Sequence, residues 1–245
     1  MAETEGVDVA FLHKRIVPVF RRLRDYSRVK VDGMEHVPRE GPTLLVANHT
    51  GWLGLDYAFT ALSVYEETER IVRGMAHAAW FANGATARFA ERCGITRITK
   101  DAIRDQLDQD RLVLMFPEGE KGAFRPGSEY RLEEFARGFV RLAMETGVPV
   151  VPVCILGGEE ANPVGTRIES YEELVNMKGG LPIPRNLIPK PVKWRIRFLE
   201  PRDWSRHGAA GADDRELVHA LAQATRQDIQ DGVDRLKIER GHPYF

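Results

Sequence analysis

The sequence predicts an α/β fold in which a mostly parallel sheet is flanked by helices, with an amphipathic helix at the N-terminus and a long helix at the C-terminus. Short apolar runs typical of buried strands alternate with segments of helical periodicity, an order that favours parallel strands covered on both faces. The length of 245 residues suits one large domain, or one domain with a helical appendage. We therefore expect an N-terminal amphipathic helical segment (1–28), a central domain (29–204) and a C-terminal helix (205–245).

The first segment combines helical periodicity with positive charge. Apolar residues of 9–26 recur near one helical face, although Pro18 interrupts the pattern. Within 14–30, seven cations accompany a single acid, Asp25. A helix of this kind can lie on an anionic bilayer with its cations reaching lipid phosphates, or pack on the domain with a solvated basic face. The sequence leaves both interpretations open.

The remaining elements follow from local patterns. Strands are predicted where apolar or alternating side chains run between turn residues, at 29–31, 43–47, 71–73, 112–116, 150–156 and 193–199. Helices are predicted where apolar residues recur at helical spacing, at 56–64, 78–92, 100–107, 132–145 and 213–239. Gly94 and Gly147 are suited to end two of these helices. Four prolines between 179 and 191 predict a loop with little helix or sheet.

The overall composition argues against several classes of protein. A formal net charge of −1 argues against nucleic acid as a partner, and 43% hydrophobic residues predict a packed core. The two cysteines, Cys93 and Cys154, lack metal-ligand spacing and are expected to be buried in a reducing compartment. The chain has no apolar run of about 18 residues, and its acidic N-terminus lacks the order of a signal peptide. We expect a cytoplasmic protein or one on the cytoplasmic face of a membrane.

A histidine and an aspartate flank a glycine-bearing loop after the second predicted strand. Asn48 and His49 follow the apolar run 43–47, and Asp56 opens the next predicted helix. Open α/β sheets commonly place their ligands at such strand ends. A histidine beside a carboxylate can accept a proton near neutral pH, because its unperturbed pKa is about 6.5 and the carboxylate fixes its tautomer. The alternative interpretation is a buried histidine beside a helix that Asp56 caps.

Three further motifs follow in a fixed order. They are Gly94-Ile95-Thr96-Arg97 after a predicted helix, Phe116-Pro117-Glu118-Gly119 at the end of a predicted strand, and Val148-Pro149-Val150-Val151-Pro152 entering another strand. Together with Asn48-His49 and Asp56, this order resembles the glycerolipid acyltransferase family, typified by bacterial 1-acylglycerol-3-phosphate acyltransferases, over about residues 30 to 200. The resemblance implies that the central domain 29–204 is an acyltransferase domain.

The family resemblance implies a lipid O-acyltransferase of phospholipid biosynthesis. Such an enzyme moves a fatty acyl group from acyl-CoA or acyl carrier protein, as co-substrate, to a hydroxyl of a glycerolipid or related lipid at the membrane surface. His49 would be the general base and Asp56 its orienting partner. Because the thioester supplies its own activation, neither a metal nor a redox cofactor is implied. The residues implied to bind the acceptor are Arg97, Phe116, Pro117, Glu118, Gly119 and Lys121, with Arg125 as a further candidate for a phosphate.

Two departures from the family pattern keep other functions open. Six residues separate His49 from Asp56 where four are usual, which resembles a bacterial branch with a longer, glycine-bearing loop. Glu120 stands where a hydroxyl side chain is usual, which weakens the case for glycerol phosphate as the acceptor. The alternatives are a thioester or ester hydrolase that uses the same histidine, and a catalytically silent lipid-binding protein of this fold.

A long acyl chain would need an apolar groove. The pairs Trp52-Leu53 and Trp80-Phe81 are candidates to line it. For Trp80, packing in the core is the preferred interpretation.

Overall fold

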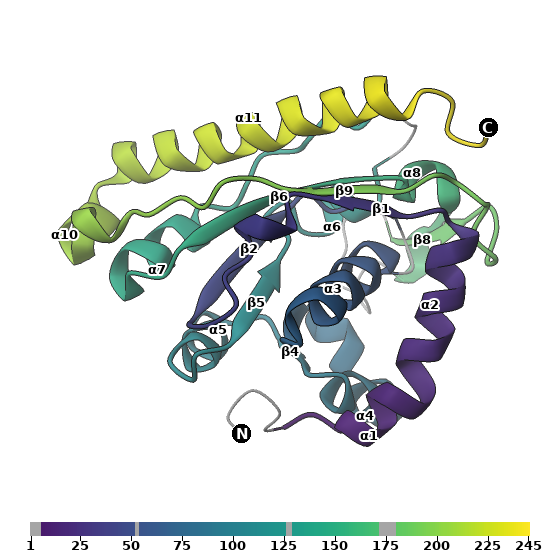
Figure 1. Ribbon diagram of the computed structural model, residues 1–245, viewed down its shortest axis with the longest axis horizontal. Helices are drawn as coiled ribbons and strands as arrows, with labels where there is room; N and C mark the ends of the chain where they lie inside the picture. Colours follow the sequence, from purple (N-terminus) through teal and green to yellow (C-terminus); the bar gives the residue numbers. More distant parts are fainter. Residues whose placement is uncertain (1–5, 52–53, 126–128, 172–179) are drawn as a thin grey trace.

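A seven-stranded sheet forms the centre of the molecule, as the α/β prediction requires (Figure 1). The computed structural model describes residues 6–51, 54–125, 129–171 and 180–245. The strand order is β1-β9-β6-β2-β5-β3-β4, and every neighbouring pair is parallel except β6 and β9. The mostly parallel arrangement is therefore confirmed. The strands are β1 (Lys30–Asp32), β2 (Thr43–Ala47), β3 (Val72–Ala76), β4 (Ile95–Arg97), β5 (Leu112–Met115), β6 (Val150–Leu156) and β9 (Arg195–Phe198).

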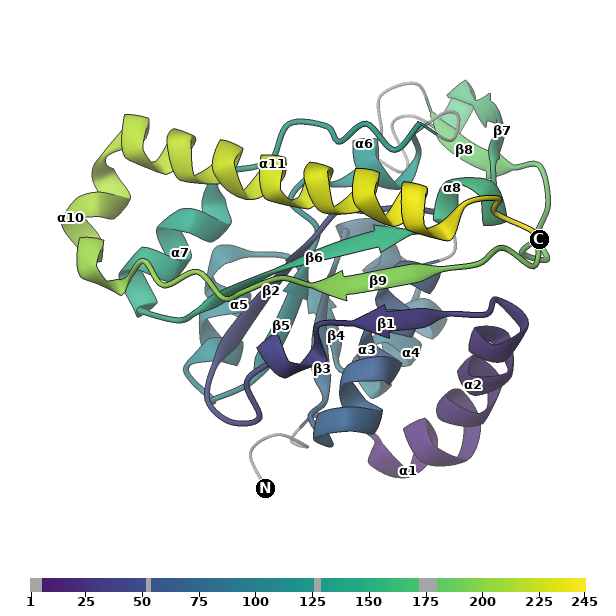
Figure 2. The same ribbon diagram turned by 45° about the horizontal axis from the view of Figure 1, so that its top comes forward.

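Helices cover both faces of this sheet (Figures 1 and 2). One face carries α3 (Leu55–Thr68), with α2 (Val17–Tyr26) packed beside it. The other face is covered by α5 (Lys100–Leu107), α7 (Gly138–Thr146), α10 (Gly208–Asp213) and α11 (Arg215–Arg240). The shorter helices are α1 (Val9–Phe11), α4 (Gly84–Arg92), α6 (Glu120–Ala123) and α8 (Gly158–Ala161).

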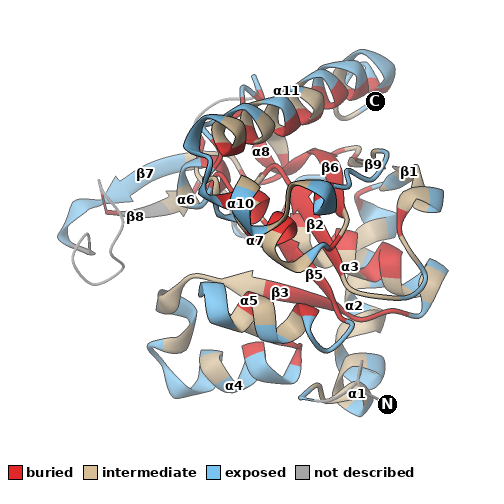
Figure 3. Cartoon of the chain, turned by 90° about the vertical axis from the view of Figure 1, so that its left-hand side faces the viewer, coloured by how far each residue is buried: buried red, intermediate tan, exposed pale blue. Residues whose placement is uncertain are grey.

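The central strand β2 supplies side chains to two separate cores. Because successive side chains of a strand point to opposite faces, Leu44 and Val46 pack with α5, α7 and α11, whereas Leu45 and Ala47 pack with α3. All five residues of β2 are buried. Figure 3 shows the same division, with β2, β5 and β6 buried and the outward side of α11 exposed. The strand end that carries His49 therefore leaves a fully covered sheet.

The helix predicted at 132–145 begins only at Gly138, so its first turns were predicted wrongly. The backbone N–H groups there bond to distant acceptors and not within a helix. Leu132 N donates to Gln230 Oε1 (2.8 Å), and Ala136 N donates to the carbonyl of Pro117 (2.9 Å). These acceptors lie far away in the sequence, so the apolar periodicity of the segment gave no sign of them.

Three other local predictions also differ from the structure. The segment 78–92 divides into a 3₁₀ turn (Ala78–Phe81) and α4, because the Asn83 side chain accepts a bond from Ala85 N and starts a new helix. The proline-rich segment 179–191 contains β8 (Leu181–Pro184), which pairs with β7 (Val164–Ile168) in a separate antiparallel ribbon. The edge strand β4 was also not predicted, because three residues are too few to show the pattern of a strand.

The N-terminal helix continues through Pro18. A π-helical turn (Leu12–Ile16) precedes α2, and Pro18 lies in the first turn of α2. The helix packs on α3, and both Arg21 and Arg24 form ion pairs with Glu66. Part of the basic face of this helix therefore forms ion pairs within the molecule.

The predicted C-terminal helix is present as α11, whose Asp214 side chain accepts bonds from Glu216 N and Leu217 N at 3.0 Å each. It lies along β6, where a side chain at Gly232 would meet Cys154 Sγ at 2.3 Å. Glycine at this position thus lets the helix approach the sheet. Among the described residues, no helix combines the length and apolar character needed to cross a bilayer.

The loop after β2 approaches the start of α8 so closely that only glycine fits there. A Cβ on Gly158 would lie 2.3 Å from the carbonyl oxygen of Thr50, an atom of the backbone that cannot swing aside. Gly138 is a matched reference, because it also opens a helix but has no atom within 4 Å of its ideal Cβ.

We predict that Gly158→Ala lowers the free energy of unfolding by about 1–3 kcal/mol, since the loop must shift to admit the methyl group. Gly138→Ala should change it by less than about 1 kcal/mol and can raise it. Urea unfolding of both variants checks this prediction. Equal stability of the two variants would show that the contact between the loop and α8 is not tight.

Candidate active site

His49 and Asp56 form a hydrogen-bonded pair at the carboxyl end of β2. The His49 Nδ1 atom lies 2.5 Å from Asp56 Oδ2, and Asp56 is fully buried whereas the His49 side chain is 21% exposed. Since the carboxylate accepts, Nδ1 carries the hydrogen and Nε2 keeps a lone pair. The sequence prediction that these two residues lie together, despite the longer loop between them, agrees with the geometry.

Asp56 does not cap α3, contrary to the alternative considered from the sequence. The residue at the N-cap is Gly54, with φ of 67°, and Asp56 lies within the first turn. Its carboxylate accepts from Thr50 N (2.9 Å) and Tyr57 N (2.8 Å) in addition to the histidine. The side chain thus organises the loop that precedes it as well as the imidazole.

Asn48 fastens the end of β2 to the neighbouring strand. Its side-chain amide donates to the carbonyl of Ile155 (2.9 Å) and accepts from Ile155 N (2.7 Å). This two-point contact replaces the next rung of the parallel ladder between β2 and β6. It holds the backbone directly before His49 in place.

The Phe116–Gly119 turn lies against His49. The His49 backbone N–H donates to Glu118 Oε2 (2.8 Å), and the imidazole stacks on the ring of Phe116 with 4.2 Å between centroids. Gly119 has φ of 59° and ψ of −150°, a backbone conformation that favours glycine. The parallel register of β2 and β5 brings these two strand ends together.

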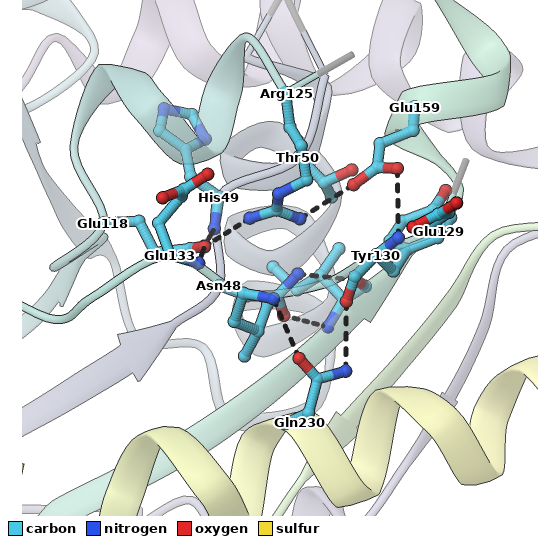
Figure 4. Close-up of polar contacts among 12 residues, drawn as sticks. Asn48, His49, Thr50, Glu118, Arg125, Glu129, Tyr130, Glu133, Glu159 and Gln230 are labelled. Carbon is cyan, nitrogen blue, oxygen red and sulfur yellow. Dashed lines mark hydrogen bonds and ion pairs between the residues drawn. The ribbon is translucent and has the colours of Figure 1, made fainter. Parts of the chain in front are cut away.

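A buried ionic cluster supports Glu118, and sequence reasoning missed most of it. Figure 4 shows the Arg125 guanidinium between Glu118 and Glu159. Arg125 was a sequence candidate for phosphate binding; instead it is buried and both of its terminal nitrogens are engaged within the protein. Burial raises the pKa of Glu118 above its usual value and that of Glu159 to about 7. Two carboxylates thus share one guanidinium.

The cluster continues to the C-terminal helix. Tyr130 N donates to Glu159 Oε2 (3.3 Å), and the Gln230 side chain donates to the carbonyl of Tyr130 (3.1 Å). The Tyr130 hydroxyl bonds to Glu160, which also pairs with Arg240 (2.6 Å). No local sequence signal identified these partners, because they come from segments up to a hundred residues apart.

A cavity of about 1200 Å³ opens beside His49 and Asp56. Of the sequence candidates, Phe116, Pro117, Glu118, Gly119 and Lys121 line it together with His49 and Asp56. Arg97 does not; it is exposed at the end of β4. Trp80 lines the cavity and is 46% exposed, so its expected core packing is wrong. Trp52 and Leu53 lie outside the described residues.

In the described part of the chain, no group of three or more histidine, cysteine, aspartate or glutamate side chains is arranged to hold a metal ion. Cys93 and Cys154 are free and buried, as expected. Burial raises the pKa of the Cys154 thiol to about 12 and that of Cys93 to about 11, which disfavours the reactive thiolate in both.

The sequence is similar to proteins of one known family. A family model described as Acyltransferase matches residues 28–156, more than half of the chain. An uncharacterised protein of Mycobacterium tuberculosis is 34% identical over 98% of this chain and 70% of its own length. The lyso-ornithine lipid O-acyltransferase of Pseudomonas aeruginosa is 33% identical over 81% of this chain and 70% of its own length.

A solved structure has the same fold. The 1-acyl-sn-glycerophosphate acyltransferase of Thermotoga maritima aligns with a TM-score of 0.61 and 20% identity, over 93% of this chain and 81% of that one. The family model and the lyso-ornithine lipid O-acyltransferase at 33% identity establish that the chain belongs to the acyltransferase family.

Proposed function

We propose that this enzyme transfers a fatty acyl group from an acyl thioester to a hydroxyl of a glycerolipid or related lipid, with His49 as general base. The observation that carries the proposal is the 2.5 Å bond between His49 Nδ1 and the buried Asp56, which leaves Nε2 as a base at the edge of a large cavity. The names of relatives, among them a lyso-ornithine lipid O-acyltransferase and a 1-acyl-sn-glycerol-3-phosphate acyltransferase of Brassica napus, support a lipid acceptor.

The proposed reaction needs one proton carrier. His49 Nε2 removes the proton from the acceptor hydroxyl while the oxygen of this hydroxyl attacks the thioester carbonyl, so that a C–O bond forms. The buried Asp56 stabilises the imidazolium that results. When the C–S bond breaks, the thiolate leaves and takes the proton back from Nε2. The products are an oxygen ester and a free thiol, and the enzyme returns to its initial state.

We assign Glu118 a positioning role in place of the acceptor contact that the sequence suggested. Its Oε2 accepts from His49 N, and its Oε1 accepts from Glu133 N (2.7 Å) and Arg125. These donors come from the protein itself, and the side chain is fully buried. Glu118 therefore holds the His49 backbone in the position from which Nδ1 bonds to Asp56.

The acyl chain is proposed to occupy an apolar arm of the cavity. This arm lies between the N-terminal helices, α3 and α4, and we define it by the residues Leu12, Ile16, Phe20, Leu62, Trp80 and Phe89. Burying a long chain there is favourable by about 0.8 kcal/mol for each methylene group. Because the N-terminal helices form one wall, an acyl chain can enter from the side on which a membrane would lie.

Attachment to a membrane is proposed to use the outer side of these helices. Arg15, Val19, Arg22 and Tyr26 follow each other at helical spacing and are all exposed. Among the described residues, Arg15 and Arg22 have no carboxylate partner, unlike Arg21. A stripe that mixes free cations with apolar side chains suits the interface of an anionic bilayer.

Replacement of His49 by alanine should reduce acyl transfer by at least about 10²–10⁴-fold, because it removes the proposed proton acceptor. Asp56→Asn should reduce it by a similar factor, since the neutral amide cannot stabilise the imidazolium. The measurement is product formation from radiolabelled acyl-CoA across a panel of lipid acceptors.

His36→Ala, at a histidine outside the cavity, is the control for this pair of variants. Full transfer by a purified, folded His49→Ala protein would rule out the mechanism. Release of free fatty acid at the same rate with and without acceptor would identify a hydrolase, and bound lipid without turnover would identify a silent binding protein.

The stability of the buried cluster should depend on pH. The pKa of Glu159 is raised to about 7, so between about pH 4.5 and 7 the folded protein holds a proton that the unfolded chain has released. The free energy of unfolding should therefore fall as pH rises through this window, by roughly 1–3 kcal/mol. Urea unfolding at pH 5 and pH 8 measures the change.

Glu159→Gln should flatten this dependence, because the amide does not titrate. Glu129→Gln, at an exposed position, should leave it as in the wild type. If wild type and Glu159→Gln lose equal stability between the two pH values, the ionisation of Glu159 does not control it.

Membrane binding can be tested without deleting the helix that forms the cavity wall. Replacing Lys14, Arg15 and Arg22 by glutamine should weaken binding to phosphatidylglycerol vesicles at least tenfold, since each cation near an anionic surface contributes about 1 kcal/mol. Vesicle co-sedimentation at low and physiological salt measures this.

The control for the vesicle experiment replaces Lys190, Arg206 and Arg235, which removes the same charge outside the N-terminal helix. Equal weakening by both triple variants would mean that total charge, and not this helix, determines the binding.

A further inference from the structure

One side of the cavity is cationic, and the mechanism above does not use it. Lys121, Arg137, Arg141 and Arg215 line the same cavity as His49. We call Arg137, Arg141 and Arg215 the arginine track. None of them belongs to the four sequence motifs that predicted the site.

The arginine track begins beside the catalytic pair. Glu133 N bonds to Glu118, and Ala136 N bonds to the carbonyl of Pro117, so the segment that ends at Arg137 is fastened to the turn that contacts His49. Arg141 lies one helical turn further along α7. Its Nε donates to the carbonyl of Ala212 (3.1 Å), which places it next to the start of α11, where Arg215 lies.

Most of this positive charge is not neutralised by the protein. Within the described residues, Lys121, Arg141 and Arg215 have no carboxylate at ion-pair distance. Arg137 lies 3.5 Å from Glu134, an exposed pair that contributes little. Asp56 and Glu118 also line the cavity, but their oxygens are occupied by donors described above. Only the carboxylates of Glu120 and Glu134 remain to oppose the four cations in the lining.

The cationic side and the apolar arm lead in different directions from the catalytic pair. Figures 1 and 2 both place α7 and α10 at one end of the molecule and α1 and α2 at the other, with β2 and β5 between them. A ligand whose reactive carbon lies at His49 can therefore extend an apolar chain one way and an anionic group the other way.

We propose that the arginine track binds the phosphate groups of an acyl donor in which the acyl chain is carried as a phosphopantetheine thioester. This inference rests on the proposed function and adds the residues that bind the phosphates of the donor. Arginine guanidinium groups suit phosphate because their paired N–H groups match two phosphate oxygens. Coenzyme A and the acyl carrier protein share the phosphopantetheine group, so both can present this chemistry.

The extent of the track favours the donor over a phosphorylated acceptor. In a glycerol phosphate acceptor, the phosphate lies only a few bonds from the hydroxyl that reacts, within reach of Lys121 or Arg137 alone. In the donor, the pantetheine arm separates the phosphates from the thioester carbon. Arg141 lies a helical turn beyond Arg137 and next to the start of α11 with Arg215, an order that suits phosphates held at a distance from the reacting carbon.

The test measures binding of free coenzyme A to the full chain by calorimetry, together with steady-state kinetics. Arg141→Ala/Arg215→Ala should raise the Kd for coenzyme A and the KM for acyl-CoA by at least tenfold. The KM for the lipid acceptor should not change. With an acyl-N-acetylcysteamine thioester, which lacks phosphate, kcat/KM should equal that of the wild type, and this also shows that the variant is folded.

A parallel assay with acyl carrier protein as donor identifies which phosphate is bound. A higher KM of the double variant for both donors would show that the track binds the shared phosphopantetheine phosphate. A higher KM for acyl-CoA alone would show that it binds the nucleotide phosphates. Arg131→Ala, at an exposed arginine outside the cavity, is the matched control.

An unchanged Kd for coenzyme A in the double variant, or a rise in the acceptor KM alone, would overturn the inference. The proposed function fails separately, because binding of coenzyme A is measured without turnover. A protein that binds coenzyme A through the track but transfers no acyl group would contradict the proposed function only.

Discussion

The bond from the His49 backbone N–H to Glu118 Oε2 joins the two strand ends on which the site is built. The parallel pairing of β2 with β5 brings the ends close, but the ladder stops at Val46 and Met115. Beyond it, a side chain connects the two strand ends. Glu118 makes this connection to β5, and Asn48 makes a second connection, to β6, through Ile155. With both neighbours held, the imidazole stacks on Phe116 and bonds to Asp56.

Burial of Glu118 disfavours its negative charge, and the rest of the cluster partly compensates for this effect. An isolated carboxylate out of water would favour its protonated form, which could no longer accept two N–H bonds and pair with a cation. The Arg125 guanidinium offsets much of that desolvation through its ion pair with Glu118. It also forms an ion pair with Glu159, and the pKa of Glu159 is raised to about 7. The cluster extends through Tyr130 and Gln230 to α11. The C-terminal helix is therefore connected to Glu118, and through it to His49, by a chain of hydrogen bonds and ion pairs.

Sequence reasoning succeeded where a pattern depends on neighbours in the chain and failed where it depends on the fold. The bounds of β2, α5 and β6 were predicted correctly, since apolar runs and helical spacing are local signals. The segment 132–137 has helical periodicity, yet its N–H groups bond to Gln230, Glu118 and Pro117. Arg125 suggested a phosphate ligand for the same reason: its partner Glu159 is 34 residues away, and nothing local showed that it would be buried.

The longer loop between His49 and Asp56 is accommodated because the aspartate serves the loop as well as the ring. Asp56 Oδ2 accepts from both His49 Nδ1 and Thr50 N, so the chain turns around a single carboxylate oxygen directly after the histidine. Gly51 then has φ of 93°, and Gly54 has φ of 67° where α3 begins. Both glycines thus have positive φ angles, which favour glycine, on either side of the lengthened part of the loop. The spacing in the sequence can therefore lengthen while the distance between base and carboxylate stays that of a hydrogen bond, and it is this distance that the proposed chemistry requires.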